Sequence, residues 1–334
     1  MSSAVKQQDA APLDLRAVYA PIETELAEVE RILQSELRSR FPRVDEMVRY
    51  GFQLGGKRLR PALLLLSAKA VGEVTRDHLL LAAVVEMIHT ATLVHDDVLD
   101  EADVRRHLAT ANTRWNNEAS VLLGDFLFTH AFYLASTLDS TWACRMIGRA
   151  TNIVCEGELR QIANRGNFAL SESEYFDIVG AKTAELCACC CQLGAHYAGA
   201  DEETTQRLSR YGHGLGTAFQ IADDLLDVVG DERQAGKSLG TDLEKQKPTL
   251  PLIHTLKRAG TQQRERILAI VENGAEDRRR ELMPWMNRFG AVGYARGQAR
   301  AFATSARGEL ACLSKSPALE SLILLTRFVV LRSH

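Results

Sequence analysis

Residues 94–106 read VHDDVLDEADVRR, and residues 219–227 repeat the core of that motif as FQIADDLLD. Each copy contains D-D-x-x-D within apolar, helix-forming sequence. On a helix, positions i and i+4 share a face, so Asp96 and Asp100 point the same way, as do Asp223 and Asp227. Like charges at this spacing destabilise an isolated helix, and buried carboxylates are costly unless a cation neutralises them.

The two acidic clusters allow two interpretations. A solvated helix face would have polar neighbours, but the first cluster is flanked by Val98 and Leu99 and the second by Leu225 and Leu226. Oxygen ligands without cysteine or paired histidine favour a hard cation, and Mg2+ is commonly held by one or two carboxylates plus substrate phosphates. We therefore predict Mg2+ binding by Asp96, Asp97, Asp100, Asp223, Asp224 and Asp227.

Length and composition limit the class of protein. The chain has 334 residues, of which 46% are hydrophobic, so it can bury a substantial core. A net charge of -3 argues against nucleic-acid binding. Residues 1–13 are expected to form a flexible N-terminus without a signal core. No run of about 18 apolar residues occurs, so no transmembrane segment is expected.

Seven cysteines in a chain without a secretory signal indicate reduced thiols and a cytoplasmic location. Four of them lie in residues 186–192, LCACCCQ, which suggests a metal site at first sight. Consecutive helical residues point in different directions, however, and free cysteine packs as a small buried hydrophobe. We therefore expect these four side chains in the core of a helical protein.

The helical pattern extends over nearly the whole chain. Only eight prolines occur, and long segments are rich in Ala, Leu, Glu and Arg, which predicts an all-α protein. Helices are expected at residues 14–38, 79–100, 116–137, 141–164 and 203–229, and another should begin at a capping box, Ser171-x-x-Glu174. Since no linker or composition break is present, residues 14–334 are expected to form a single domain.

Residues 55–61, GGKRLRP, precede an apolar helix and suggest an anion site. Pro61 suits the first turn of a helix, where its missing N–H costs nothing. The glycine pair allows Lys57 and Arg60 to converge at the helix N-terminus, where anions bind well. A loop with ordinary surface cations is the alternative interpretation.

In their order along the chain, these motifs resemble the trans-isoprenyl (polyprenyl) diphosphate synthases of the long-chain, octaprenyl or solanesyl, type. The resemblance covers roughly residues 20 to 333 and rests on GGKRLRP, both aspartate clusters, Lys182-Thr183, Phe219-Gln220 and the Lys237 loop. It implies an isoprenoid-synthase helical bundle around a deep central cavity. It also implies several Mg2+ ions in each active site and a homodimer.

The resemblance further implies a reaction and residue roles. An allylic diphosphate of the geranyl or farnesyl type would lose diphosphate, and isopentenyl diphosphate would attack the resulting carbocation. Catalytic roles are implied for Asp96, Asp100, Arg105, Lys182, Thr183, Gln220, Asp223 and Lys237. Substrate contacts are implied for Gly56, Lys57, Arg60, His89, Arg105, Arg106, Lys182, Thr183, Phe219, Gln220, Lys237 and Lys247.

Two positions depart from the family pattern. The family commonly has glycine and then proline after the arginine pair, whereas this chain continues with His107-Leu108-Ala109. Gln246 stands where glycine is usual before Lys247. The conformation of both loops is therefore open at the level of sequence.

Product length can be argued from side-chain size. Residues four to eight positions before Asp96 should line the cavity at a depth of about 6 to 12 Å. Short-chain members place bulky aromatics there, whereas this chain has Ile88, Ala91 and Thr92. We predict a long-chain product, octaprenyl to decaprenyl, of the kind that supplies quinone side chains. Tight helix packing is the alternative explanation of these small residues.

Other functions explain the motifs less well. A terpene cyclase would not need GGKRLRP or a second complete D-D-x-x-D, and a phosphohydrolase built on His95-Asp96 would lack further histidine ligands. A short-chain synthase and a non-catalytic partner subunit of a heteromeric synthase remain alternatives. Peripheral membrane contact is conceivable for release of a hydrophobic product.

Overall fold

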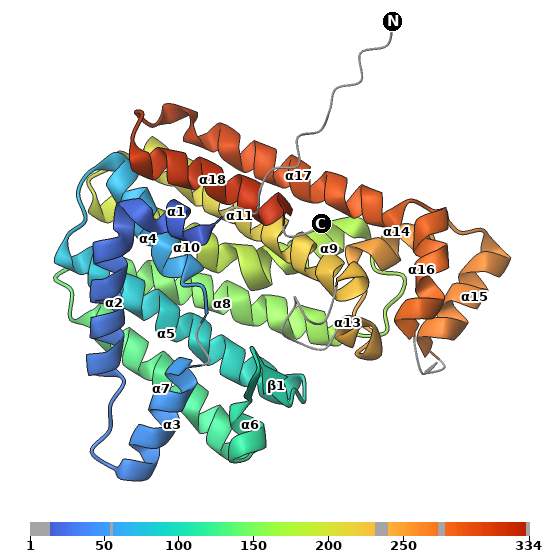
Figure 1. The fold of residues 1–334 in the computed structure, drawn as a ribbon, viewed down its shortest axis with the longest axis horizontal. Helices are drawn as coiled ribbons and strands as arrows, with labels where there is room; N and C mark the ends of the chain where they lie inside the picture. Colours follow the sequence, from blue (N-terminus) through green and yellow to red (C-terminus); the bar gives the residue numbers. More distant parts are fainter. Residues whose placement is uncertain (1–13, 54–55, 231–239, 273–277, 332–334) are drawn as a thin grey trace, which may run out of the picture.

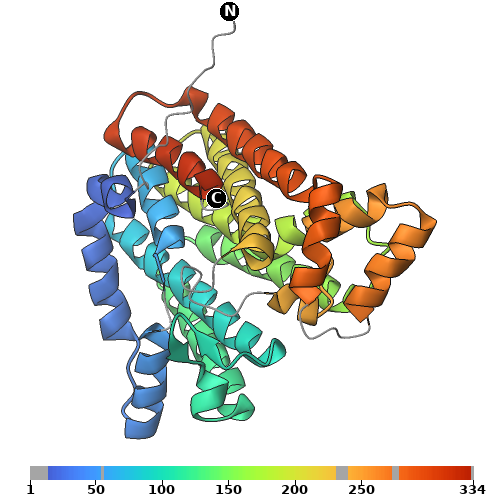
Figure 2. The same cartoon turned by 45° about the vertical axis from the view of Figure 1, so that its right-hand side comes forward.

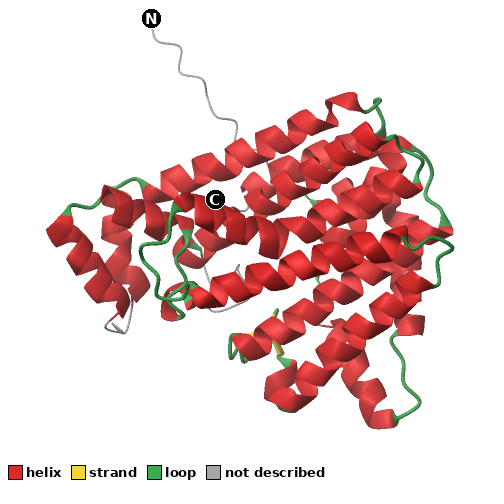
Figure 3. Ribbon diagram, turned by 180° about the vertical axis from the view of Figure 1, so that it is seen from behind, coloured by secondary structure: helices red, strands yellow, loops and turns green. Residues whose placement is uncertain are grey.

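The computed structural model describes residues 14–53, 56–230, 240–272 and 278–331. The expected flexible N-terminus and Lys237 lie outside these residues. In the described part, the only strands are the two-residue β1 (Val104–Arg105) and β2 (Leu108–Ala109), which pair as an antiparallel hairpin. Everything else that is regular is helical, and most connections gather at the two ends of the bundle (Figure 3). The all-α prediction is confirmed.

Four long helices form the centre of the bundle. They are α4 (Leu59–Val71), α5 (Arg76–Leu99), α10 (Glu185–Tyr197) and α11 (Glu202–Val229). α4 packs against α5 and α10, and α10 packs against α11. Leu63, Leu64, Leu65 and Leu66 are all 0% exposed, so α4 is covered on every side. A helix that is apolar all round is stable only in such a position.

The outer helices cover this centre. They include α7 (Asn117–Ser136), α8 (Trp142–Ala163), α9 (Glu172–Val179), α17 (Ala291–Glu309) and α18 (Pro317–Leu331), with the short α6 (Ala111–Arg114) beside the hairpin. α17 lies along α11, and α7 lies along α5 (Figure 1). A second group comprises α13 (Thr241–Glu244), α14 (Leu250–Arg258), α15 (Thr261–Glu272) and α16 (Arg278–Arg288). α15 and α16 extend beyond one end of the bundle, on the right in Figure 2.

The predicted helix boundaries are confirmed to within three residues for four long helices, α5, α7, α8 and α11. Their ends follow the local chemistry. Asn116 caps α7 by accepting from the amide of Ala119, and Asp201 caps α11 by accepting from Thr204. The capping box at Ser171 and Glu174 is also confirmed, since each side chain bonds the other's backbone N–H.

The N-terminal region differs from the prediction of one helix over residues 14–38. It is divided into α1 (Leu15–Tyr19), a 3-10 turn η1 (Ala20–Ile22) and α2 (Glu23–Glu36). Pro21 lies in that turn, and its missing N–H and fixed ring interrupt the helix. The next helix, α3 (Pro42–Gln53), was not predicted, and a second 3-10 turn, η3 (Leu310–Cys312), follows α17.

The cysteines lie where the core interpretation places them. Cys187, Cys189, Cys190 and Cys191 are at most 4% exposed in α10, and all seven cysteines are free thiols. Burial raises the pKa of Cys187, and burial raises that of Cys189 to about 12. Thiols that stay protonated are poor nucleophiles and poor metal ligands, so these side chains serve as apolar filling.

Within the part of the chain that the structure describes, two helices, α5 and α7, have the length and composition of a membrane span. Length and composition alone do not make either helix a membrane span, and the expectation of no transmembrane segment stays a prediction. For α5, 67% of the most apolar window is buried within the bundle, so its apolar character is that of a core helix. For α7 the buried share is 39%, because one of its faces is exposed.

The start of α5 depends on a neutral histidine. His78 is fully buried, its Nδ1 accepts from the amide of Thr75 at 2.9 Å, and its Nε2 lies 3.1 Å from the carbonyl of Gly194 on α10. Burial lowers the pKa of His78. A lowered folded-state pKa means that stability is present above the unfolded-state value of about 6.5 and is lost as pH falls.

We therefore predict that His78→Gln, which keeps an acceptor at this capping position, loses less stability than the wild type between about pH 7.5 and pH 5.5. Thermal unfolding of both proteins at the two pH values measures the difference. Equal losses in the two proteins would show that His78 does not contribute to the pH dependence.

Candidate active site

Both aspartate clusters lie at the C-terminal ends of central helices. α5 and α11 run in the same direction and end on the same side of the bundle (Figures 1 and 2). Asp96 lies in the last turn of α5, and Asp100 is its C-cap residue. Asp223 and Asp227 lie in the last two turns of α11. The fold therefore brings together two motifs that are more than 100 residues apart in the sequence.

Every aspartate of the first cluster contacts a cationic side chain. Asp97 is 1% exposed, and its Oδ1 accepts from Nε and Nη2 of Arg105 at 2.8 and 2.7 Å. Asp96 lies 3.8 Å from Nζ of Lys182. Asp100 has three cationic partners within 3.2 to 3.4 Å, which are Arg165, Lys245 and Lys247.

These contacts offset the cost of burying the carboxylates. Burial raises the pKa of Asp96 even though Lys182 opposes the shift, and burial raises that of Asp97 even though Arg105 opposes it. Burial alone would also raise the pKa of Asp100, but Lys247 and Lys245 outweigh it and lower the value. The first cluster is therefore a set of carboxylates whose environment demands positive charge.

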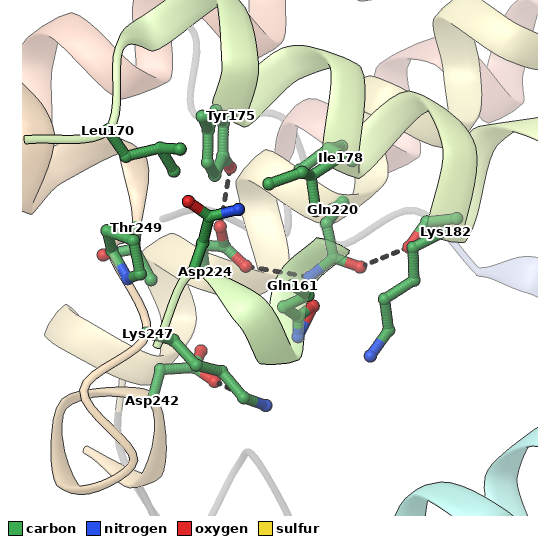
Figure 4. A pocket seen from close by; sticks show the side chains of 14 residues that line it. Gln161, Leu170, Tyr175, Ile178, Lys182, Gln220, Asp224, Asp242, Lys247 and Thr249 are labelled. Carbon is green, nitrogen blue, oxygen red and sulfur yellow. Dashed lines mark hydrogen bonds and ion pairs between the residues drawn. The ribbon is translucent and has the colours of Figure 1, made fainter. Parts of the chain in front are cut away.

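A buried chain of hydrogen bonds organises part of the second cluster (Figure 4). Thr183 Oγ1 donates to Gln220 Oε1 at 2.8 Å, and Gln220 Nε2 donates to Asp224 Oδ1 at 2.8 Å. The hydroxyl of Tyr175 donates to the other oxygen of Asp224 at 2.6 Å. Burial, together with Asp242, raises the pKa of Asp224 to about 7. These hydrogen bonds fix the orientation of the Gln220 amide.

A second series of contacts links the two clusters through Asp242 and Lys247. Asp227 is fully buried and accepts from the backbone amide of Asp242 at 3.2 Å and from the hydroxyl of Thr241 at 3.3 Å. The carboxylate of Asp242 lies 3.5 Å from Nζ of Lys247, which also contacts Asp100 at 3.4 Å. Lys247 thereby joins the end of α5 to the end of α11.

A local change of helix type presents Lys182 and Thr183. Residues Gly180–Ala184 form a single π-helical turn between α9 and α10. π-turns insert an extra residue into a helix and often occur at functional sites. On the opposite helix, a Cβ at Gly157 would lie 2.5 Å from the backbone nitrogen of Lys182, so only glycine allows this approach. Lys182 is held there by Glu158, with which it forms an ion pair.

A pocket with a cavity volume of about 90 Å³ opens beside these side chains (Figure 4). It is lined by Gln161, Asn164, Leu170, Tyr175, Ile178, Val179, Lys182, Thr183, Gln220, Asp224, Asp242, Lys247, Pro248 and Thr249. One part of the lining is polar, with two lysines, two aspartates and neutral hydrogen-bonding side chains, and the other part is apolar. This is the combination that a diphosphate attached to a hydrocarbon requires. A deep central cavity stays a prediction.

Several arginines lie close enough to His89 to affect its charge, and one of them, Arg105, also binds Asp97. The Nε of Arg60 is buried and has no hydrogen-bond partner. Burial lowers the pKa of His89, and Arg60, Arg106 and Arg105 lower it further, so the imidazole is neutral. A Cβ at Gly56 would lie 2.2 Å from the guanidinium of Arg106, so glycine lets the hairpin side chain approach the GGKRLRP loop. These residues form a cationic group that suits an anion.

The remaining predicted site residues are placed as follows. Lys57 is exposed, and its Nζ lies 5.4 Å from the ring centre of Phe328. Phe219 and Asp223 are half-buried on α11. Arg58, between Lys57 and the predicted Arg60, has a different role: it binds Glu86 at 2.7 Å and also Glu30, which anchors α4 to α5 and α2.

The three predicted chain-length residues differ in exposure. Ile88 and Ala91 are 1% and 0% exposed, whereas Thr92 is half-buried. Thr92 lies four residues before Asp96 and shares its helix face, while Ala91, five residues before Asp96, does not. His89, one turn before Thr92, is also half-buried. The accessible face of α5 therefore carries His89, Thr92 and Asp96.

Both departures from the family pattern adopt left-handed backbone. Arg106 and His107, with φ of 52° and 65°, form the two-residue turn of the hairpin. Gln246 has φ of 54°. Glycine adopts this conformation without strain, which explains why it is usual at such positions. The Gln246 carbonyl accepts from the amide of Gly166 at 2.9 Å and so ties its loop to the α8–α9 turn.

Sequence reasoning did not identify several residues of the site. They are Glu158, Arg165, Tyr175, Asp242 and Lys245. Each is an ordinary polar residue on a helix or loop, with no motif around it. Only the polar spacing of Glu158 and Gln161 on α8, one turn apart, could have indicated a face directed at the site.

The donor set fits Mg2+, the cofactor predicted from the sequence. Six carboxylates are available, and the buried Oδ2 of Asp97 has no hydrogen-bond partner. Among the described residues, no group of three or more His, Cys, Asp or Glu side chains is arranged so that it could hold a metal ion. The contacts with Lys182, Arg105 and Lys247 show instead that this region accepts positive charge. Hard oxygen donors of this kind suit Mg2+.

Comparison with known proteins identifies the family. The polyprenyl synthetase family model matches residues 41–283. The chain belongs to the polyprenyl synthetase family. It is therefore a prenyltransferase of the polyprenyl diphosphate synthase type. It is 38% identical to octaprenyl diphosphate synthase of Escherichia coli, over 93% of this chain and 96% of that protein. Short-chain synthases are also among its relatives.

Solved structures of polyprenyl synthetases share the fold. A decaprenyl diphosphate synthase from Rhodobacter capsulatus superimposes with a TM-score of 0.90 at 35% identity, covering 95% of this chain and 98% of the other. A polyprenyl synthase from Caulobacter crescentus, complexed with calcium and isoprenyl diphosphate, gives 0.90 at 34% identity, with coverages of 96% and 98%. The isoprenoid-synthase fold is thus confirmed.

We predict that His107→Gly raises the free energy of unfolding by about 0.5 kcal/mol, because glycine removes the left-handed strain but loses more backbone entropy on folding. Ala109→Gly, in the neighbouring strand, is the control and should lower stability by about 0.5 to 1 kcal/mol. Denaturant unfolding measures both values. A loss of stability in His107→Gly equal to the control would show that the left-handed strain is negligible.

Proposed function

We propose that this polyprenyl synthetase condenses isopentenyl diphosphate with an allylic diphosphate of the geranyl or farnesyl type, releasing diphosphate and forming a long-chain all-trans polyprenyl diphosphate. The observation that carries the proposal is the meeting of two D-D-x-x-D clusters beside a pocket whose lining combines lysines and other polar side chains with apolar ones. Family membership agrees with this reaction.

The allylic diphosphate would bind between the two clusters. Lys182, Arg105 and Lys247 already lie against carboxylates there and can bind phosphate oxygens as point charges or as a fork. Asp96, Asp100 and Asp223 would hold Mg2+, with support from Asp97, Asp224 and Asp227. Bound Mg2+ would supply the charge that stabilises the departing diphosphate. A role for Lys237 also stays a prediction.

The carbocation formed by this departure needs negative potential without a nucleophile. Gln220 Oε1 and Thr183 Oγ1 offer oxygen dipoles at the wall of the pocket, and Asp224 and Tyr175 hold Gln220 in place. The π electrons of isopentenyl diphosphate then form the new carbon–carbon bond. The released diphosphate is the expected acceptor of the proton lost from the condensed product.

Isopentenyl diphosphate would bind at the arginine group around His89. Arg60 has a buried, unpartnered Nε, and neutral His89 can donate a hydrogen bond to a phosphate oxygen. Arg106 approaches from the hairpin across Gly56, and Lys57 precedes α4.

A long-chain product is supported by the residues before the first cluster and by the octaprenyl and decaprenyl enzymes among the relatives. Ile88, Ala91 and Thr92 include no aromatic side chain. A short-chain synthase is the alternative, because short-chain enzymes belong to the same family. A non-catalytic partner subunit is a further alternative.

We further propose a homodimer that works in the cytoplasm. α7 exposes Val121, Leu122 and Tyr133 at 42, 67 and 62% of their surfaces, which is a large apolar face for a second copy to cover. All seven cysteines are free, as expected in a reducing compartment. Peripheral contact with a membrane would assist product release.

The reaction can be tested directly with the purified chain. With Mg2+, labelled isopentenyl diphosphate and farnesyl diphosphate, we expect products that contain eight or more isoprene units after dephosphorylation and chromatography. Products that end at geranylgeranyl would support the short-chain alternative. No condensation with any allylic primer would favour the partner-subunit alternative.

We predict that Thr92→Phe shortens the product by several isoprene units, because it places an aromatic ring on the face of α5 that carries Asp96. Ala91→Phe is also predicted to shorten the product. Ala91 is fully buried, however, so the larger ring should cost about 1 to 3 kcal/mol of stability. Product sizing together with thermal unfolding separates the two effects. An unchanged product from a folded Thr92→Phe enzyme would contradict the prediction that Thr92 lines the cavity for the growing product.

A further inference from the structure

The carboxylate of Asp100 is shared by more cations than it can neutralise. Nη2 of Arg165 and Nζ of Lys245 both contact Oδ1, at 3.2 and 3.3 Å, and Nζ of Lys247 contacts Oδ2 at 3.4 Å. One negative charge thus faces three positive charges, and only Lys247 has a second acidic partner, Asp242, in the described part of the chain. Asp100 by itself therefore cannot neutralise the three cations that contact it.

The backbone conformation at Gln246 and a backbone hydrogen bond to Gly166 bring these cations together. Gln246 lies between the two lysines with φ of 54°, and this left-handed residue turns the chain so that Lys245 and Lys247 reach the same carboxylate. The hydrogen bond from the amide of Gly166 to the carbonyl of Gln246 fixes the turn that carries Arg165 against this loop. Two segments about 80 residues apart are therefore held in one arrangement.

Stability alone is a weak reason for this arrangement. The side chains of Arg165 and Lys245 are 30 and 25% exposed, and partly exposed ion pairs contribute little. The Nε of Arg165 is buried and has no hydrogen-bond partner, which leaves a donor unsatisfied next to Asn164 in the pocket wall. An anion with several oxygens would give this donor a partner and would also accept from the cations that now share Asp100.

We propose that Arg165 and Lys245 are two further residues of the allylic-diphosphate site, and that they bind the diphosphate alongside Lys247. This inference rests on the proposed function and extends it to two residues outside the family motifs. A diphosphate carries several charged oxygens, so it can accept from the fork of Arg165 and from both lysines at once. The carboxylate of Asp100 would then no longer be paired with these cations and would be available to bind Mg2+.

Arg165→Gln and Lys245→Gln test the proposal, with matched controls in Arg160→Gln, in the last turn of α8, and Lys257→Gln, on α14. Calorimetry of inorganic diphosphate binding in the presence of Mg2+ gives the affinity of each protein. Steady-state assays give KM for the allylic substrate and for isopentenyl diphosphate, and thermal unfolding gives stability. Arg165→Lys is included as the conservative variant.

We expect each Gln variant to bind diphosphate roughly 5- to 10-fold more weakly and to raise the allylic KM similarly. KM for isopentenyl diphosphate should not change, the controls should match the wild type, and Arg165→Lys should recover part of the loss. Unchanged diphosphate affinity, with or without reduced thermal stability, would overturn the proposal and leave the enzyme's function intact. A wild-type protein that binds no diphosphate with Mg2+ would instead refute the proposed function itself.

Discussion

The structure depends on pairing the carboxylates at the end of α5 with positive charge. Asp96, Asp97 and Asp100 end a core helix that the bundle covers on most sides, so their charges cannot be left to solvent. Lys182, Arg105 and Lys247 meet this requirement from three different segments. The same cations can later bind phosphate, which is why the contacts that stabilise the site also prepare it for a substrate.

Backbone geometry determines which side chains can take part. The π-helical turn at Gly180–Ala184 directs Lys182 and Thr183 into the pocket, and Gly157 gives that turn room. Left-handed residues do the same for the loops, since Arg106 turns the hairpin towards Gly56 and Gln246 directs two lysines to Asp100. Small local costs in conformation are thus offset by the charges that they bring together.

Arginines that are neighbours in the sequence divide between structural and binding roles. Arg58 satisfies Glu86 and Glu30 and holds α4 against α5 and α2. Arg60, two residues later, keeps a buried Nε without a partner. Because Arg58 is the left-handed N-cap residue of α4 whereas Arg60 lies in the first turn of the helix, a single basic motif can supply both an anchor and an anion site. The series of hydrogen bonds from Tyr175 to Thr183 also combines a structural and a binding role, because its buried members support the Gln220 amide at the pocket wall.

The sequence by itself determined the all-α class, the ends of the long helices, the core position of the cysteines and the family, because these follow from local periodicity, capping chemistry and ordered motifs. Pro21 interrupted a helix that the pattern joined, and α3 was missed. Only the tertiary structure decided that Asp224 accepts from Tyr175, that Lys247 joins the two clusters, and that Arg165 and Lys245 converge on Asp100. These contacts join residues that are tens to more than a hundred positions apart, so their geometry depends on how helices cross and where loops turn, which no local pattern of side chains encodes.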